Sequence, residues 1–270
     1  MRNLLGRSTL VVTVLCGLAS LPSAAQTPTY KAPRTADGKP NLNGIWQALN
    51  SANWDLEAHA ARPGLVVALG AEASEPGGLS VVEGDGAIPY LPAAMAARKK
   101  NFETRLTADP EIKCYLPGVP RATYMPYPFQ IFQSDKAIAI AYEYDGAFRN
   151  IYLKDPGPAP ADAWMGQSVG HWEGDTLVVD VTGLDERTWF DRSGNYHSDA
   201  LHVVERYTPL GPDTLTYEAS IEDSKVFSRP WKISMPLYRH VEKNAQLLEF
   251  KCVEFVEELM YGNFRKKTTQ

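Results

Sequence analysis

The chain has 270 residues, of which 44% are hydrophobic, 22% charged and 10% aromatic, with 20 glycines and 20 prolines. This composition is typical of a globular protein, and it excludes a disordered tail, a coiled coil and a collagen-like fibre. The formal net charge is −5. A negatively charged surface argues against nucleic acid and against anionic lipid as partners.

Residues 1–25 have the pattern of a secretory signal peptide. Arg2 and Arg7 make a basic start, a mostly apolar stretch follows, and Ser23 and Ala25 supply the small residues of a cleavage site. The apolar stretch is too short and wrongly flanked for a transmembrane anchor. We therefore expect cleavage after Ala25 and a periplasmic or secreted protein with no membrane span. Cleavage takes the net charge from −5 to −7, because the removed segment carries two positive charges.

Cleavage would leave two cysteines, Cys114 and Cys252. In an oxidising compartment, two thiols in one chain are a candidate disulfide pair. The alternative is two separately buried free thiols. Closing so long a loop restricts the unfolded chain, which corresponds to a stabilisation of about 4–5 kcal/mol.

The first part of the chain, residues 26–110, is predicted to be an extended arm plus a helix packed on the core. Its lead-in is rich in proline, residues 44–47 resemble a short strand, and residues 60–90 are rich in glycine, alanine and proline. A helix is predicted over residues 92–106, because Pro92 stands near its start and an apolar stripe follows at helical spacing.

The remaining residues, 111–270, are predicted to form an antiparallel β core closed by a C-terminal helix at 253–264. Short runs with a period of two, rich in β-branched and aromatic residues, alternate with turn signals. The predicted fold is mainly β, an antiparallel barrel or sandwich that is lipocalin-like. No βαβ unit and no glycine-rich phosphate loop is present, so we expect no nucleotide cofactor. The predicted strands are residues 129–133, 137–144, 148–153, 169–172, 176–181, 201–208, 214–221, 231–238 and 247–250.

The proline-rich loop 120–128 presents Arg121, Tyr124 and Tyr127. A rigid loop that holds a guanidinium and phenols suits recognition of a carboxylate or a phenolic oxygen. The alternative is a crossover whose tyrosines plug one end of a barrel. Trp172 is a further candidate for substrate binding, because aromatic side chains around a cavity favour a flat, apolar ligand, although packing is their ordinary role.

Titratable side chains are concentrated in residues 189–207. His197, Asp199 and His202 are candidate catalytic residues, because a carboxylate that fixes the tautomer of a histidine makes a general acid/base pair. The alternative is that Asp199 caps a turn and His202 is a hydrogen-bonded barrel residue. Strand alternation places Glu205 on the opposite face from His202. We assign no role to Glu205.

A metal site is the other interpretation of these histidines. His171, His197 and His202 could supply three imidazoles to a catalytic zinc with one open position. Their spacing matches no strong zinc signature. We therefore expect no metal.

Several longer motifs resemble a large family of uncharacterised secreted bacterial proteins, many from organisms that degrade aromatic compounds. The motifs are residues 35–46, 113–126 (KCYLPGVPRATYMP), 171–180 (HWEGDTLVVD) and 197–206 (HSDALHVVER), followed by Arg229-Pro230-Trp231. The resemblance also carries a weaker association with cofactor-free breakdown of lignin-derived phenolics, including decarboxylation.

Two functions follow as hypotheses. The first is a cofactor-independent lyase, before an isomerase or hydrolase, acting on a small phenolic or carboxylated aromatic compound. Arg121 would hold the carboxylate, Tyr124 or Tyr127 would contact a phenol oxygen, and His197 or His202 would move the proton. The second is a lipocalin-like binding protein without catalysis. The enzyme is favoured, because the titratable groups cluster more tightly than binding requires.

Overall fold

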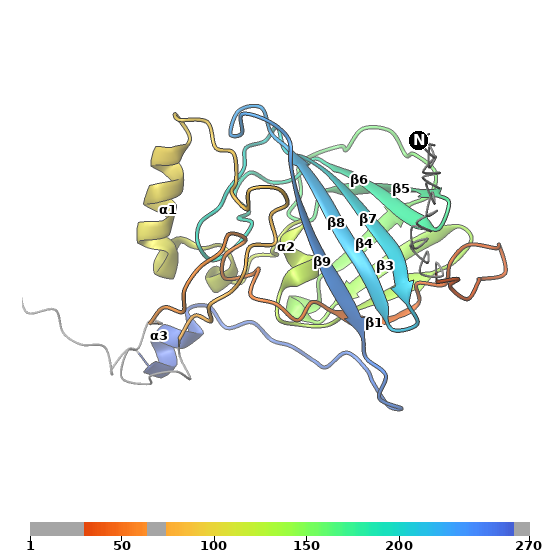
Figure 1. Cartoon of the computed structure of the whole chain (residues 1–270). Helices are drawn as coiled ribbons and strands as arrows, with labels where there is room; N and C mark the ends of the chain where they lie inside the picture. The colour runs from red at the N-terminus through yellow and green to blue at the C-terminus, as the bar shows by residue number, and fades with distance from the viewer. Residues whose placement is uncertain (1–29, 64–73, 262–270) are drawn as a thin grey trace, which may run out of the picture.

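The structure, a computed structural model, describes residues 30–63 and 74–261, so the predicted signal peptide lies outside the described residues. Nine strands form a closed barrel in the order β1 to β9 (Figure 1). The predicted mainly β, lipocalin-like barrel is confirmed. The strands are β1 Gly44–Gln47, β2 Phe129–Gln133, β3 Ala137–Tyr142, β4 Phe148–Tyr152, β5 Gln167–Glu173, β6 Thr176–Thr182, β7 His202–Gly211, β8 Thr214–Glu222 and β9 Trp231–Arg239.

Strand pairing in the barrel is antiparallel with one exception. β4 and β5 run parallel, with Ile151 opposite Ser168, because the long connection between them returns the chain to the end at which β4 began. β1 closes the barrel by pairing with both β2 and β9. With the barrel closed in this way, the predicted last strand at residues 247–250 does not form. That segment instead packs on the outside, where Phe250 contacts the ring of Tyr127.

The period-two pattern sets which side chains fill the barrel. In β8, Leu215, Tyr217, Ala219 and Ile221 are buried, while the residues between them are half-exposed. Because successive side chains of a strand point to opposite faces, the buried set lines the interior. The interior is therefore a packed core of aliphatic and aromatic side chains.

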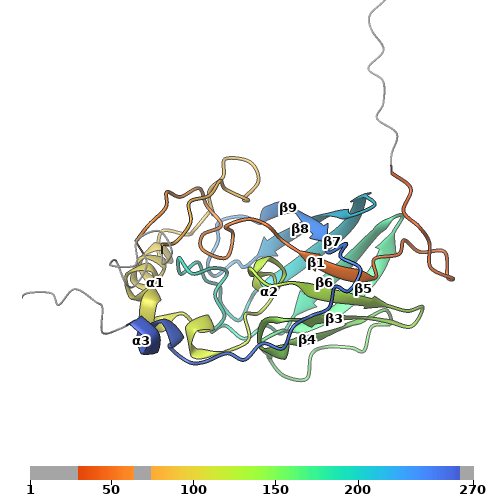
Figure 2. The same ribbon diagram turned by 90° about the horizontal axis from the view of Figure 1, so that it is seen from below.

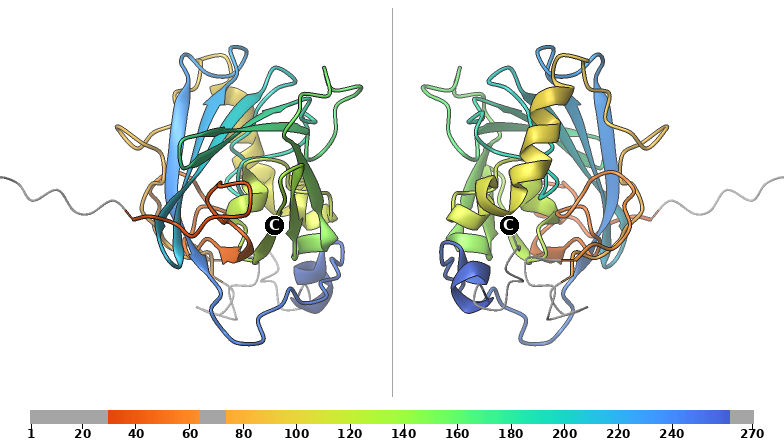
Figure 3. Two further views of the ribbon diagram at one scale, coloured as in Figure 1. Left: turned by 90° about the vertical axis from the view of Figure 1, so that its right-hand side faces the viewer. Right: turned by 90° about the vertical axis from the view of Figure 1, so that its left-hand side faces the viewer.

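The helices are α1 Met95–Ala108, α2 Arg121–Tyr124 and α3 Val256–Tyr261, and short 3-10 turns lie at Glu111–Lys113 and Tyr144–Gly146. They gather toward one end of the barrel, called here the helical end (Figure 2). Seen from that end, α1 lies across the front of the strands (Figure 3). The lead-in to β1 lies at the opposite end (Figure 1). No helix in the described part of the chain is long and apolar enough to cross a membrane.

The predicted helix at 92–106 forms three residues later than expected. Met95 and Leu106 of its expected apolar stripe are exposed, and no residue of α1 is buried. Phe102 is covered by arginine, with the guanidinium carbon of Arg105 lying 4.3 Å from its ring centroid. The helix is thus attached by cation–π and polar contacts more than by an apolar face.

The predicted disulfide is present. Cys114 and Cys252 are bonded with an S–S distance of 2.05 Å and a Cα–Cα distance of 5.6 Å, across a sequence separation of 138 residues. The bond fixes the segment after β9 to the turn that precedes α2.

Candidate functional site

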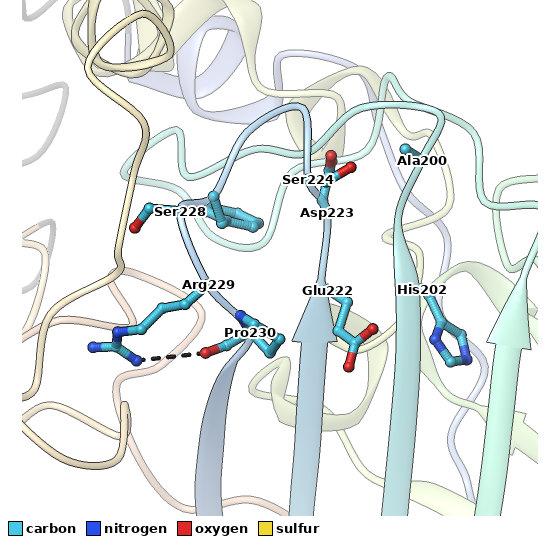
Figure 4. Close-up of a pocket in the computed structure, with 9 residues that line it drawn as sticks. Ala200, His202, Glu222, Asp223, Ser224, Ser228, Arg229 and Pro230 are labelled. Atoms are coloured by element: carbon cyan, nitrogen blue, oxygen red, sulfur yellow. Dashed lines mark hydrogen bonds between the residues drawn. The ribbon is translucent and has the colours of Figure 1, made fainter.

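A cleft of about 290 Å³ opens on the outer surface near the helical end of the barrel (Figure 4). We call it the His202 cleft. The beginning of β7, the end of β8 and the connection to β9 form its walls. Its lining residues are Ala200, His202, Glu222, Asp223, Ser224, Phe227, Ser228, Arg229 and Pro230.

His202 is the first residue of β7, and its side chain is 38% exposed on the outer face. Its Nε2 lies 3.1 Å from Oδ1 of Asp180 on β6, the neighbouring strand. A carboxylate in this position fixes the tautomer and orientation of an imidazole. Among the described residues no hydrogen-bond partner occupies Nδ1, so the second ring nitrogen is available to a ligand in the cleft.

The charged groups in the cleft differ in how much they are already bound. Asp223 accepts hydrogen bonds from the backbone N–H and the hydroxyl of Ser198, at 2.6 and 3.0 Å, so it serves the loop before β7. Arg229 is 55% exposed, donates from Nη1 to the carbonyl of Pro230 at 3.4 Å, and lies 3.8 Å from Asp85, which is beyond hydrogen-bond distance. Glu222 is exposed and lies directly opposite His202 in the β7–β8 pairing. Arg229, Glu222 and His202 therefore remain for a ligand.

His197 and Asp199 do not form the expected pair. His197 is 3% exposed, and both ring nitrogens are in use: Nδ1 donates to the carbonyl of Ser198 at 2.8 Å, and Nε2 lies 2.6 Å from the hydroxyl of Thr188. Burial lowers the pKa of His197, which favours the neutral ring. Asp199 is exposed and forms an ion pair with Lys225. These contacts tie the loop down and leave no nitrogen for a substrate.

Arg121 lies in the interior and does not face a cleft. Its guanidinium donates to both carboxylate oxygens of Asp109, at 2.8 and 2.9 Å, to Glu111 at 3.2 Å, and to the side chain of Asn53 at 2.9 Å. Burial alone would lower the pKa of Arg121, but the two carboxylates outweigh it and raise that pKa above its usual value. Arg121 thus anchors the crossover, which matches the alternative interpretation of this loop.

The other predicted substrate-binding residues also lie away from the His202 cleft. Tyr124 is buried and donates to the carbonyl of Phe190 at 2.8 Å. Tyr127 packs against the rings of Tyr144 and Phe250. Trp172 is partly buried on β5 and packs against the core. All three therefore have packing roles in this structure.

The alternative zinc set is not assembled. His171 is exposed on β5 and lies 3.3 Å from Glu173, while His202 faces Asp180 and His197 is enclosed. In residues 30–63 and 74–261, no group of three or more His, Cys, Asp or Glu side chains has the geometry to hold a metal ion.

A buried ion pair inside the barrel joins two residues that sequence reasoning passed over. Arg149 of β4 donates through Nη2 to Glu205 of β7 and through Nε to Ser168, at 2.7 Å. The other carboxylate oxygen of Glu205 accepts from the hydroxyls of Tyr207 at 3.1 Å and Tyr217 at 2.8 Å. We call this group the Arg149–Glu205 cluster. The signal that could have revealed it is a carboxylate at an inward position of a strand.

Buried hydroxyls surround this ion pair. Burial raises the pKa of Tyr142, whose hydroxyl lies near both Arg149 and Thr123. Arg149 Nη1, the Tyr142 hydroxyl and the Thr123 hydroxyl have no hydrogen-bond partner among the described residues. All of these side chains are almost fully buried. The cluster therefore organises the barrel core and is not open to a ligand from outside.

No family model matches the chain, and a search of curated proteins finds no significant match.

Proposed function

We propose that this protein is a periplasmic or secreted, cofactor-independent lyase that acts on a small phenolic or carboxylated aromatic compound in the His202 cleft. One observation carries the proposal. His202 is held by Asp180 in the wall of a cleft and keeps Nδ1 available to a ligand, and Arg229, whose side chain is 55% exposed, lines the same cleft.

Each side chain of the cleft has a separate role in this proposal. Arg229 holds the substrate carboxylate, because a guanidinium matches a carboxylate with two parallel hydrogen bonds. Phe227 and Pro230 supply apolar surface for the ring. His202 moves the proton, since imidazole can both accept and donate one near neutral pH. Asp180 is a positioning residue that keeps Nδ1 directed into the cleft.

In a decarboxylation, the bond between the ring system and the carboxylate breaks and its electron pair stays on the substrate carbon. Carbon dioxide leaves from the Arg229 side. The imidazolium of His202 then donates its proton to that carbon, which completes the balance without an oxidant or a reductant. Glu222 lies directly opposite His202 in the β7–β8 pairing and places a carboxylate beside the proton donor.

The test starts from a panel of phenolic acids and lignin-derived dimers, incubated with the purified protein and analysed by mass spectrometry for loss of carbon dioxide or formaldehyde. His202→Gln should lower turnover of the reacting compound by about 100-fold or more, as for a lost acid/base group. His171→Gln is the matched control, because His171 also pairs with a carboxylate on the outer face but lies outside the cleft. Equal turnover by His202→Gln and the parent protein would refute the proposal.

A binding protein without catalysis is the second candidate. A closed barrel is an architecture of small-molecule carriers, and Arg229 beside apolar surface is sufficient for binding. This candidate predicts that panel compounds bind and remain unchanged, and that Arg229→Gln weakens binding while His202→Gln barely alters it. Turnover of any panel compound that depends on His202 would exclude it.

A further inference from the structure

A second cleft, of about 260 Å³, lies at the end of the barrel opposite the helical end. We call it the Arg239 cleft. It opens between the lead-in to β1, which contributes Pro33, and the end of β7 with the turn to β8, which contribute Pro209 and Pro212. Arg239, the last residue of β9, lines it together with Leu215. The His202 cleft lies at the other end of β7, β8 and β9, and the two clefts share no lining residue.

The guanidinium of Arg239 is held in a fixed position. Its central carbon lies 4.1 Å from the ring centroid of Trp46, which is almost fully buried. Its Nη1 donates to the carbonyl of Asn43 at 2.6 Å. Gly44 makes this arrangement possible, because a Cβ at that residue would lie 2.1 Å from Nη1. The φ of Gly44 is +143°, a backbone conformation that favours glycine.

The counter-charge of this cation lies beyond hydrogen-bond distance. The nearest carboxylate, that of Asp213, lies 3.6 Å from Nε and is itself 54% exposed. Burial lowers the pKa of Arg239, so the site disfavours an uncompensated positive charge. Arg121 is the contrast within this chain, because two carboxylates lie within hydrogen-bond distance of its guanidinium. Arg239 therefore lines the cleft with N–H groups that can still donate hydrogen bonds to a ligand.

Part of the cleft wall is apolar, and Tyr30, Asn41 and Asn43 supply its polar part. Pro33, Pro209, Pro212 and Leu215 supply rigid or aliphatic surface. We propose that the Arg239 cleft binds a small organic carboxylate with a compact apolar body. The carboxylate takes the free edge of the guanidinium, and the body lies between the prolines. The site is independent of the lyase chemistry proposed for the His202 cleft.

Benzoate is the probe, and benzyl alcohol is its uncharged analogue. Binding is followed by titration in ¹H–¹⁵N NMR spectra of the purified protein, using the backbone amides of Asn43 and Gly44 and the indole N–H of Trp46 as local reporters. Benzoate should shift these signals in a saturable way, and benzyl alcohol should bind at least about tenfold more weakly. Equal affinity for the two compounds would overturn the proposal.

Substitutions then locate the charge. Arg239→Gln should abolish the benzoate-dependent shifts at these reporters, and Arg239→Lys should weaken binding severalfold, since lysine lacks the planar fork. Arg187→Gln is the matched control: Arg187 also stacks on a tryptophan, at 4.5 Å from Trp164, but is paired with Asp185. Unchanged benzoate affinity in Arg239→Gln would refute the site.

A third variant keeps the proposal testable even if the Arg239 substitutions disturb the fold. Asp213→Asn retains Arg239 and removes the only nearby competing carboxylate among the described residues, so benzoate should bind severalfold more tightly. Weaker or unchanged binding in Asp213→Asn would count against the proposal. Because this site is separate from the His202 cleft, Arg239→Gln should retain the turnover that the panel reveals. A loss of local benzoate shifts in Arg229→Gln would assign binding to the other cleft and overturn the proposal.

Discussion

Replacement of Glu205 tests whether the Arg149–Glu205 cluster holds the barrel together. Glu205→Gln keeps the size and one carbonyl oxygen for the hydroxyls of Tyr207 and Tyr217, but it removes the charge that Arg149 faces. Removing one partner of a buried ion pair typically costs about 3–5 kcal/mol, because the other charge stays buried without compensation. Nη1 of Arg149 already has no hydrogen-bond partner among the described residues, and Glu205 is the carboxylate that pairs with this guanidinium.

The assay is urea-induced unfolding at neutral pH with the disulfide intact, followed by circular dichroism. We expect Glu205→Gln to lower the free energy of unfolding by about 3–5 kcal/mol, a large part of the stability of an ordinary domain. The double variant Arg149→Met, Glu205→Gln should regain most of that loss, because no charge is then left buried. The coupling between the two substitutions measures the pair directly.

Glu173→Gln is the matched control. Glu173, on β5, forms an exposed ion pair with Arg206, which lies on β7 next to Glu205. Exposed ion pairs contribute little, so this variant should unfold almost as the parent protein does. The reasoning fails if Glu205→Gln is no more destabilising than Glu173→Gln. It also fails if the double variant is less stable than both single variants.

Three further predictions concern pH, the disulfide and metal. Burial, with Asp55 nearby, raises the pKa of Asp191 to about 7, so the folded state binds a proton more tightly than the unfolded chain. The stability that protonated Asp191 contributes should therefore be lost as the pH rises from about 4 to about 7. Asp191→Asn should show a flatter pH dependence of the urea midpoint over this range, and a steeper one would contradict this. Thiol titration of the denatured, unreduced protein should find no free thiol from Cys114 or Cys252, and reduction should lower stability by up to about 4–5 kcal/mol. Turnover should survive dialysis against EDTA, whereas loss on chelation and recovery with zinc would show a metal requirement.

The strand pattern of β7 shows how far sequence reasoning reaches. Alternation correctly placed His202 and Glu205 on opposite faces, and the structure shows that Glu205 is on the buried, inner face and His202 on the outer face. The functional assignment then followed residue type, and so the inward carboxylate was passed over. A charged residue at an interior position of a predicted barrel strand requires a buried partner, and Arg149, at an inward position of β4, was the available one.

The side-chain partners that sequence reasoning did not find depend on contacts that the fold brings about. The partner of His202 is Asp180, brought beside it only by the pairing of β6 with β7. The counter-charges of Arg121 come from Asp109 and Glu111, which a chain reversal returns to the same place. Sequence spacing placed His197 next to Asp199, but neighbours two positions apart in a loop can point in opposite directions. Their partners are Thr188 and Lys225 instead.

The arginines of this chain show which feature separates a structural cation from one that can recognise a ligand. Arg121 and Arg149 are buried, and each has a carboxylate within hydrogen-bond distance. Their charges are neutralised inside the protein, so neither can gain much from an external anion. Arg229 and Arg239 line open clefts, and their nearest carboxylates lie at 3.8 and 3.6 Å. A proline-rich loop and neighbouring tyrosines directed attention to Arg121, yet the distance to the nearest counter-charge, which only the fold reveals, identifies the other two.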